Sequence, residues 1–174
     1  MMRSKFDMQL EILNNSLIEM GALCERAIAT AIKALLENNI PLAKKVMESV
    51  KDINQAEKDI EAMCLKLLLQ QQPVARDLRQ ISSILKMITD MDRIGVQAGD
   101  IAEIVTFANL SKSKDRVHIA DMAEATIKMV SESINAFVKK DLELANKVIA
   151  YDDVVDDLFV KVRTGIVDLI SKDK

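Results

Sequence analysis

The sequence predicts an all-α protein built from a few long amphipathic helices. Only four of its 174 residues are Gly and two are Pro, and aromatic residues make up 3%. A β-sheet needs frequent turns and favours aromatic and β-branched side chains, so this composition is typical of long helices. Hydrophobic residues make up 49% of the chain, which favours a folded core over disorder.

Charge and hydropathy exclude several classes of protein. The net charge is -3 and no basic stripe is present, which argues against a nucleic-acid-binding protein. The longest aliphatic stretch, near Leu67 to Leu69, is far shorter than the ~20 residues that span a bilayer. The basic N-terminus is not followed by the apolar segment of a signal peptide. We therefore expect a cytoplasmic protein that is not an integral membrane protein.

Three amphipathic stripes predict three helices in the first part of the chain. In each stripe the apolar residues recur in steps of about three and four, which is the spacing of one helical face. The first helix ends near Glu37, the second runs from about Pro41 to the stop at 70–73, and the third covers about 74–108. The predicted buried positions are Phe6, Leu10, Leu13, Leu17, Met20, Cys24, Ala27, Ala31, Leu35, Leu42, Val46, Val50, Ile53, Ile60, Cys64, Leu67, Val74, Leu78, Ile81, Leu85, Ile88, Met91, Gly95, Ala98, Ala102 and Val105.

An internal repeat with a separation of 102 residues links the two parts of the chain. Leu42 matches Leu144 and Val46 matches Val148 without any gap, and the apolar pattern continues to match downstream. A repeat of this length is typical of tandem copies of one helical unit. We therefore expect two units that share the same helix arrangement.

The repeat sets the expected organisation of the chain. Residues 1–109 form a first three-helix unit, residues 110–114 a linker, and residues 115–174 a second unit of two helices. The third helix of the second unit would fall at about residues 176–210, so we expect five long helices in all. Two helices without a third leave an apolar groove, which we expect to pack against the first bundle or another subunit.

Two motifs in the third predicted helix resemble those of a known family. The run Gln72-Pro73-Val74-Ala75-Arg76-Asp77-Leu78-Arg79 is followed by Asp92-Arg93-Ile94-Gly95. Together with the tandem repeat, these runs resemble the PhoU family of phosphate-transport regulators. The resemblance marks Pro73, Asp77, Arg79, Arg93 and Gly95 as candidates for family-specific packing or partner contact. For Asp77 and Arg79, capping and packing at a helix N-terminus is the competing interpretation.

The resemblance implies a fold and a function. The fold would be a tandem of three-helix bundles with spectrin-like up-down helices, the second bundle lacking its last helix. The function would be negative regulation of phosphate uptake and phosphate-starvation signalling, without enzymatic activity. The partners would be the ATPase subunit of a phosphate ABC transporter and a sensor histidine kinase, and we also expect a homo-oligomer.

The resemblance also implies metal ions bound by paired carboxylates four residues apart. Carboxylates with this spacing lie on one helical face and can present oxygen donors to Fe, Zn, Mn, Mg or Ni. In the first unit Asp92 keeps its place but its partner has become Val96, and the second motif maps onto Val50 and Asn54. Asp100 is then the nearest substitute carboxylate.

The second unit keeps one carboxylate pair, Asp152 and Asp156. Two carboxylates on one helix make a poor metal site, because their charges repel and the other donors must come from elsewhere. The competing interpretation is a solvated acidic stretch in the first half of the helix. Asp92, Asp100, Asp152 and Asp156 remain the candidate metal ligands.

Two alternative classes of protein stay open. One is a carboxylate metalloprotein of ferritin-like type, but such sites need more than the single histidine, His118. The other is a purely structural helical module. The single histidine also argues against a catalytic triad. The two cysteines, Cys24 and Cys64, have no CxxC partner and are expected to be buried free thiols.

Overall fold

The computed structural model describes residues 2–70, 74–107 and 117–172, and all of its regular structure is helical. The helices are α1 (Met2–Glu37), α2 (Ile40–Gln70), α3 (Ala75–Phe107), α4 (Val117–Lys139) and α5 (Leu142–Lys172). The prediction of an all-α fold with five long helices is confirmed. The predicted linker at 110–114 and the end of the predicted stop at 71–73 lie outside the described residues.

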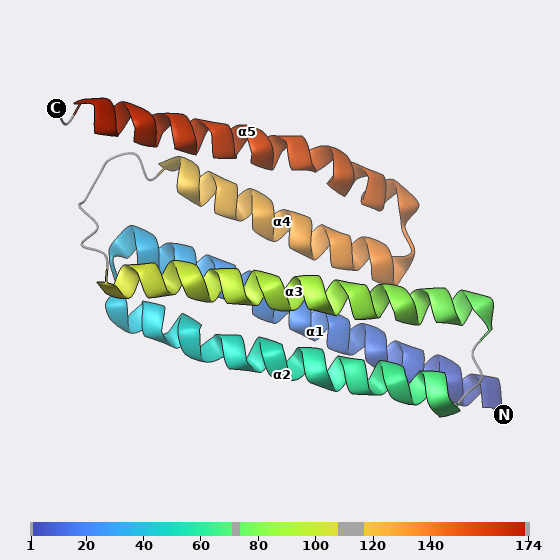
Figure 1. Cartoon of the computed structure of the whole chain (residues 1–174). Coiled ribbons are helices and arrows are strands. Elements are labelled where there is room, and N and C mark those ends of the chain that lie inside the picture. The colour runs from blue at the N-terminus through green and yellow to red at the C-terminus, as the bar shows by residue number, and fades with distance from the viewer. Residues whose placement is uncertain (1, 71–73, 108–116, 173–174) are drawn as a thin grey trace.

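Helices α1, α2 and α3 form a three-helix bundle in which each helix contacts the other two (Figure 1). Its core consists of the predicted stripes, with most of their side chains fully buried. The apolar side chains on the three inward faces account for this, because burial of a Leu or Ile side chain stabilises a fold by about 1.5–3 kcal/mol. The predicted packing of this unit is therefore confirmed in its main features.

The start of the third stripe was predicted wrongly. Val74 is 55% exposed and Leu78 is 45% exposed, whereas both were expected in the core. They lie just before and within the first turn of α3, at the end of the bundle. Further along the helix Ile84, which is absent from the predicted stripe, is fully buried, while Leu85 is only partly buried. From Ile81 to Val105 the buried positions of α3 alternate strictly in steps of three and four, and the predicted stripe departed from this alternation at Leu85.

The turn between α1 and α2 recurs between α4 and α5, 102 residues later. Asn38 and Lys140 both adopt a left-handed backbone, with φ of 51° and 56°. The next residue in each turn caps the following helix: the Asn39 side chain accepts a hydrogen bond from the Leu42 amide, and Asp141 accepts one from Leu144, at 3.0 and 2.9 Å. Because Asn39 is the cap, α2 begins at Ile40, one residue before the predicted start.

Each turn also closes the preceding helix in the same way. The Asn38 amide donates to the Leu35 carbonyl and the Asn39 amide to the Ala34 carbonyl, and Lys140 and Asp141 repeat both bonds with Phe137 and Ala136. This pattern is the Schellman motif, which satisfies the last carbonyls of a helix. The two turns, 102 residues apart, therefore have the same backbone hydrogen bonds.

The second helical pair joins the first bundle mainly at α1. The backbone of α4 lies close to that of α1, whereas among the described helices the backbone of α5 lies close only to that of α4 (Figure 1). At the interface Gly21 leaves room for Ile134, because a Cβ on Gly21 would overlap the Ile134 side chain. The repeat equivalents, Ala123 and Ile32, line one small cavity bordered by α1, α3 and α4. The expected packing of the second unit on the first bundle is confirmed for α4.

Candidate functional site

The first motif places two arginines at the start of α3. The amides of Asp77 and Leu78 donate to the Val74 carbonyl at 2.8 and 3.0 Å, which fixes the first turn. Asp77 lies in that turn, where its negative charge complements the helix dipole. Arg76 and Arg79 are exposed. Pro73, the remaining candidate of this motif, lies outside the described residues.

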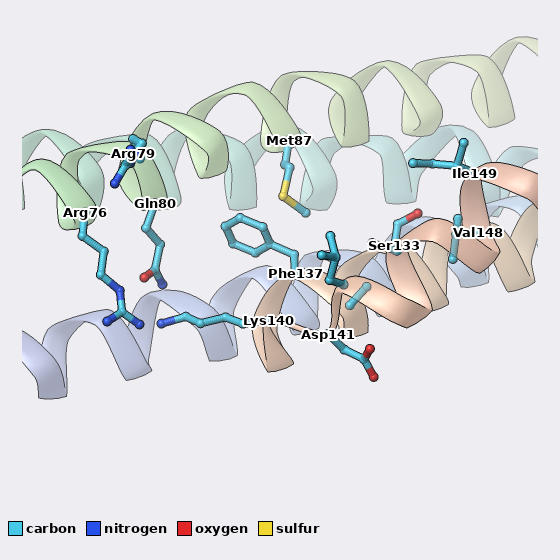
Figure 2. A pocket seen from close by; sticks show the side chains of 13 residues that line it. Arg76, Arg79, Gln80, Met87, Ser133, Phe137, Lys140, Asp141, Val148 and Ile149 are labelled. Carbon is cyan, nitrogen blue, oxygen red and sulfur yellow. The ribbon is translucent and has the colours of Figure 1, made fainter.

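A cavity of about 650 Å³ separates the first half of α3 from the turn between α4 and α5 (Figure 2). Its walls are mostly apolar, and three cationic side chains, those of Arg76, Arg79 and Lys140, stand around it. Figure 2 shows Arg76 and Lys140 reaching toward one another at one end of the cavity. The apolar lining consists of Met87, Ala136, Phe137, Leu142, Ala145, Val148 and Ile149.

A second cavity, of about 430 Å³, continues the first along α3, α4 and α5. Met87 and Ser133 line both cavities, so the two form one groove, which we call the α3–α5 groove. Asp90 and Asp152 stand at its second cavity. The groove is therefore mostly apolar, with three cations and Asp141 around its first cavity and Asp90 and Asp152 at its second.

The second motif holds α2 against α3. The Asn54 side-chain amide donates a hydrogen bond to the Asp92 carboxylate across the two helices. Gly95 lies against Ile53: a Cβ at this position would stand 2.8 Å from the nearest Ile53 methyl carbon. Arg93, by contrast, is exposed and pairs with Asp90 at 3.6 Å. Asp92 and Gly95 thus have a packing role, and only Arg93 is available at the surface.

The carboxylate of Asp92 influences the acids and thiols around it. Desolvation raises the pKa of Glu57, and the charges of Asp92 and Glu61 raise it further. Burial raises the pKa of Cys24 to about 12, with a smaller contribution from Asp92. The Cys24 thiol donates a weak hydrogen bond to the Met91 carbonyl at 3.4 Å. Among the described residues, the Asp92 carboxylate accepts a hydrogen bond from the Asn54 amide and forms no ion pair with a cation.

The four candidate metal ligands are not brought together. Asp92 and Asp100 are both on α3, two turns apart, which is about 12 Å along the axis. Asp152 and Asp156 are exposed on α5, and no described residues of α3 and α5 come into backbone contact. Val50 and Val96 stand where the family pattern places carboxylates. The donors of the first unit therefore do not fit a metal ion.

The rest of the described chain provides no stronger metal site. Across residues 2–70, 74–107 and 117–172, no three His, Cys, Asp or Glu side chains gather closely enough to hold a metal ion. A site at Asp152 and Asp156 would need donors from outside this part of the chain, so metal binding there stays a prediction.

The remaining reactive side chains have ordinary environments. His118 is half exposed and pairs with Asp121 at 3.6 Å. Cys24 and Cys64 are buried free thiols, as predicted. Within the described ranges, no helix combines the length and apolarity that crossing a membrane requires.

Comparison with known proteins shows which family has this arrangement of helices. The family model described as the PhoU domain matches residues 17–105 and again residues 119–174. The chain belongs to the PhoU family. The relatives that carry this name are accessory proteins of phosphate-specific transport systems, and the family to which the chain belongs is non-enzymatic.

Individual PhoU relatives resemble nearly all of the chain. The phosphate-specific transport system accessory protein PhoU homolog of Aquifex aeolicus is 35% identical over 166 residues, covering 95% of this chain and 75% of the relative. The homolog of Clostridium acetobutylicum is 33% identical and covers 100% and 80%. The crystal structure of PhoU from Pseudomonas aeruginosa superposes with a TM-score of 0.89 at 32% identity, over 97% of this chain and 81% of that one.

Sequence reasoning predicted an apolar groove on the second helical pair but missed several of the residues that line the α3–α5 groove. Lys140, Gln80 and Phe137 line it, and none of them belongs to the two motifs. The repeat carried a usable signal, because Lys140 is the counterpart of Asn38 at the end of a helix. The distance between α3 and that turn, however, depends on how α4 packs on α1, which no local pattern specifies.

Proposed function

We propose that this PhoU-family chain is a negative regulator of phosphate uptake and phosphate-starvation signalling in the cytoplasm. It would act by contacts with the ATPase subunit of a phosphate ABC transporter and with a sensor histidine kinase. The observation that carries the proposal is the match of both parts of the chain to the PhoU domain. We further propose the organisation given by the repeat, with units at 1–109 and 115–174 and a linker at 110–114.

The exposed motif arginines support a role in partner contact. Within the described residues neither Arg76 nor Arg79 forms an ion pair, although both lie at the rim of an apolar cavity. Arginine is enriched at protein interfaces because its planar guanidinium binds carboxylates in two-point contacts. A partner segment with acidic and apolar side chains would satisfy both features of this surface.

The regulatory step is then a change of binding partner. A signal shifts such an equilibrium only if it alters the relative affinity of the chain for the transporter ATPase and the kinase. No covalent chemistry is required of the chain in this scheme. The five long helices support it, because their exposed faces offer extended surfaces for partner contact.

The proposal is tested by replacing the chain's gene with variants in its host. With Arg79→Glu we expect phosphate-starvation promoters to be active in high phosphate, and binding of the purified ATPase or kinase to fall about tenfold or more. Lys86→Glu is the matched control, since it makes the same charge change two turns along α3 at another exposed position. The proposal would be overturned if the phosphate-starvation promoters were still repressed normally after deletion of the gene. Equal effects of Arg79→Glu and Lys86→Glu would also overturn it.

The two alternative classes give different results in the same experiment. A structural helical module would bind neither the ATPase nor the kinase. A ferritin-like metalloprotein would retain iron after purification without chelator and would oxidise Fe(II).

A further inference from the structure

Helix α2 carries a regular row of three lysines on its surface. Lys44, Lys51 and Lys58 follow one another at intervals of seven residues, and all three are exposed. Seven residues make nearly two helical turns, so the side chains stand on one face at intervals of about 10.5 Å. Within residues 2–70, 74–107 and 117–172 none of them forms an ion pair. The row therefore presents three positive charges in a line.

The lysine row runs along the side of α2 that faces α3. Lys51 lies three residues before Asn54 and Lys58 four residues after it, so the three side chains leave the helix on one side. The Asn54 side chain donates a hydrogen bond to Asp92 of α3, and the two helices lie side by side (Figure 1). The row is therefore one edge of the surface that α2 and α3 form together.

Apolar side chains lie beside the lysine row on this surface. Met47 falls between the first two lysines and is 39% exposed, and Val50 is half-buried three residues further. On α3 Val96, one turn after Asp92, is 42% exposed, and on α2 Leu65 is 48% exposed. We call the whole surface the α2–α3 face: Lys44, Met47, Val50, Lys51, Asn54, Lys58, Glu61 and Leu65 of α2, and Asp92, Val96, Asp100 and Glu103 of α3.

The α3 edge of the α2–α3 face is acidic. Asp100 and Glu103 are exposed four and seven residues after Val96, which puts them on the same side of α3. In the part of the chain that the structure describes, neither forms an ion pair. An anionic membrane or a nucleic acid would be attracted by the lysines and repelled by these carboxylates. The face therefore fits a partner in which both signs of charge are ordered.

The internal repeat shows that the helical fold does not require the lysine row. Adding 102 residues to the three lysine positions gives Asn146, Asp153 and Val160 on α5. The buried positions of the same helices are kept in the repeat, as in Val46 and Val148. The row is thus a feature of the first unit alone, and a role outside the packing of the unit accounts for it.

The spacing of the lysines favours a helix as the partner. A helix lying along α2 repeats its own side chains at the same interval, so carboxylates seven residues apart would meet every lysine. An extended segment rises about 3.4 Å per residue, so the same interval takes about three residues. Side chains three apart in a strand point to opposite sides, and successive carboxylates would then miss the row.

We propose that the α2–α3 face binds an amphipathic helix of a partner protein. Carboxylates seven residues apart on that helix pair with Lys44, Lys51 and Lys58, and its apolar side chains cover Met47 and Val96. A hollow of about 340 Å³, which Lys44, Met47, Glu48 and Lys51 line, gives room for one of these side chains. The surface is separate from the α3 arginines of the proposed function, to which it adds a second place of contact.

The test uses two synthetic helices of about three heptads with Leu at positions a and d. One carries Glu at every g position and the other carries Lys there, with Gln on the remaining flank. Binding to the purified full chain is followed by fluorescence anisotropy of the labelled peptide, up to about 300 µM chain. We expect the Glu peptide to bind about tenfold or more tightly than the Lys peptide, and more weakly as salt is raised.

Variants of the chain assign the binding to the lysine row. Lys51→Glu combined with Lys58→Glu should reverse the preference, so that the Lys peptide binds more tightly than the Glu peptide. Lys45→Glu is the matched control, because it makes the same kind of charge change at an exposed position on another side of α2. It should leave both affinities unchanged. Far-UV circular dichroism and the denaturation midpoint show whether each variant is folded.

Three results would contradict the proposal. The first is that neither peptide binds, or that the wild-type chain binds both equally. The second is that Lys45→Glu acts as strongly as the double variant. The third is that the chain sediments with vesicles of phosphatidylglycerol and phosphatidylcholine, loses this in the double variant, and is not displaced by the Glu peptide, in which case the row binds a membrane. The experiment contains neither the ATPase nor the kinase, so it can fail while the proposed function stands.

Discussion

Cys24 shows how burial controls a single ionisable side chain in this fold. Desolvation raises the pKa of Cys24 from 9.0 to about 12 and that of Cys64 to about 11. Because the folded-state pKa exceeds the unfolded one, the thiols favour the folded state below pH 9, and this contribution is lost as the pH rises toward 12. The two thiols should therefore be inert in the native protein.

We expect the denaturation midpoint in guanidinium chloride to fall between pH 8 and pH 10.5, and Cys24→Ala to reduce that fall. Lysines and the tyrosine also titrate here, so the comparison of wild type with Cys24→Ala isolates the thiol. A thiol reagent at pH 8 should label neither cysteine before unfolding. Rapid labelling of Cys24 in the native protein would contradict its burial.

Asp92 offers a second test at the level of single residues. Its partner is the Asn54 amide, and the positions that would complete a carboxylate pair carry valine. We expect calorimetric titration with Mn²⁺ to show no tight site in the first unit. The double variant N54D/V96D should bind Mn²⁺ at least about tenfold more tightly than wild type, because it places two carboxylates beside Asp92. If the wild-type chain binds Mn²⁺ tightly and Asp92→Asn abolishes that binding, the donors already present around Asp92 are sufficient for a metal site.

At the level of elements, helix packing requires glycine at position 95 but not at position 165. A Cβ at Gly95 would stand 2.8 and 3.0 Å from two Ile53 carbons, whereas nothing lies within 4 Å of one at Gly165. Alanine gains about 1 kcal/mol over glycine inside a helix, while overpacking costs about 1–3 kcal/mol. Gly165→Ala should thus stabilise the protein by about 1 kcal/mol, and Gly95→Ala should destabilise it by up to about 2 kcal/mol.

Chemical denaturation of the two variants measures these changes in the free energy of unfolding. The pair controls for helix propensity, because each variant makes the same substitution within a helix. Equal stabilisation by both would mean that α2 moves away from α3 without cost, and that Gly95 is not a packing residue.

The elements could be predicted from the sequence because their signals are local. Steps of three and four mark the buried faces, and the turn at Asn38 recurs at Lys140 with the same bonds. The wrong predictions concern positions whose burial depends on the neighbouring helices. Val74 and Leu78 continue the stripe in sequence, but the bundle ends there. The candidate site shows the same division: the motif arginines could be found, but the cavity beside them depends on how distant helices pack.

At the level of the whole molecule, the two units differ in how they are held. The backbones of α1, α2 and α3 lie close together in all three combinations, whereas that of α5 lies close only to α4 and that of α4 only to α1 and α5 among the described helices. Local openings in proteins require least free energy where few buried contacts must be broken. The α4–α5 pair is therefore the part of the chain that should open first, while the three-helix bundle stays folded.

Hydrogen exchange followed by mass spectrometry measures this difference directly. Amides of α5 should exchange faster than those of α1 to α3. Ile134→Ala should accelerate exchange in α4 and α5 further, because Ile134 fills the space over Gly21 where α4 meets α1. Ile104→Ala, at a position 44% exposed on α3, is the control and should change little. If Ile134→Ala instead accelerates exchange equally in all five helices, the chain opens as one cooperative unit, and the α1–α4 interface is as essential to the first bundle as it is to the second pair.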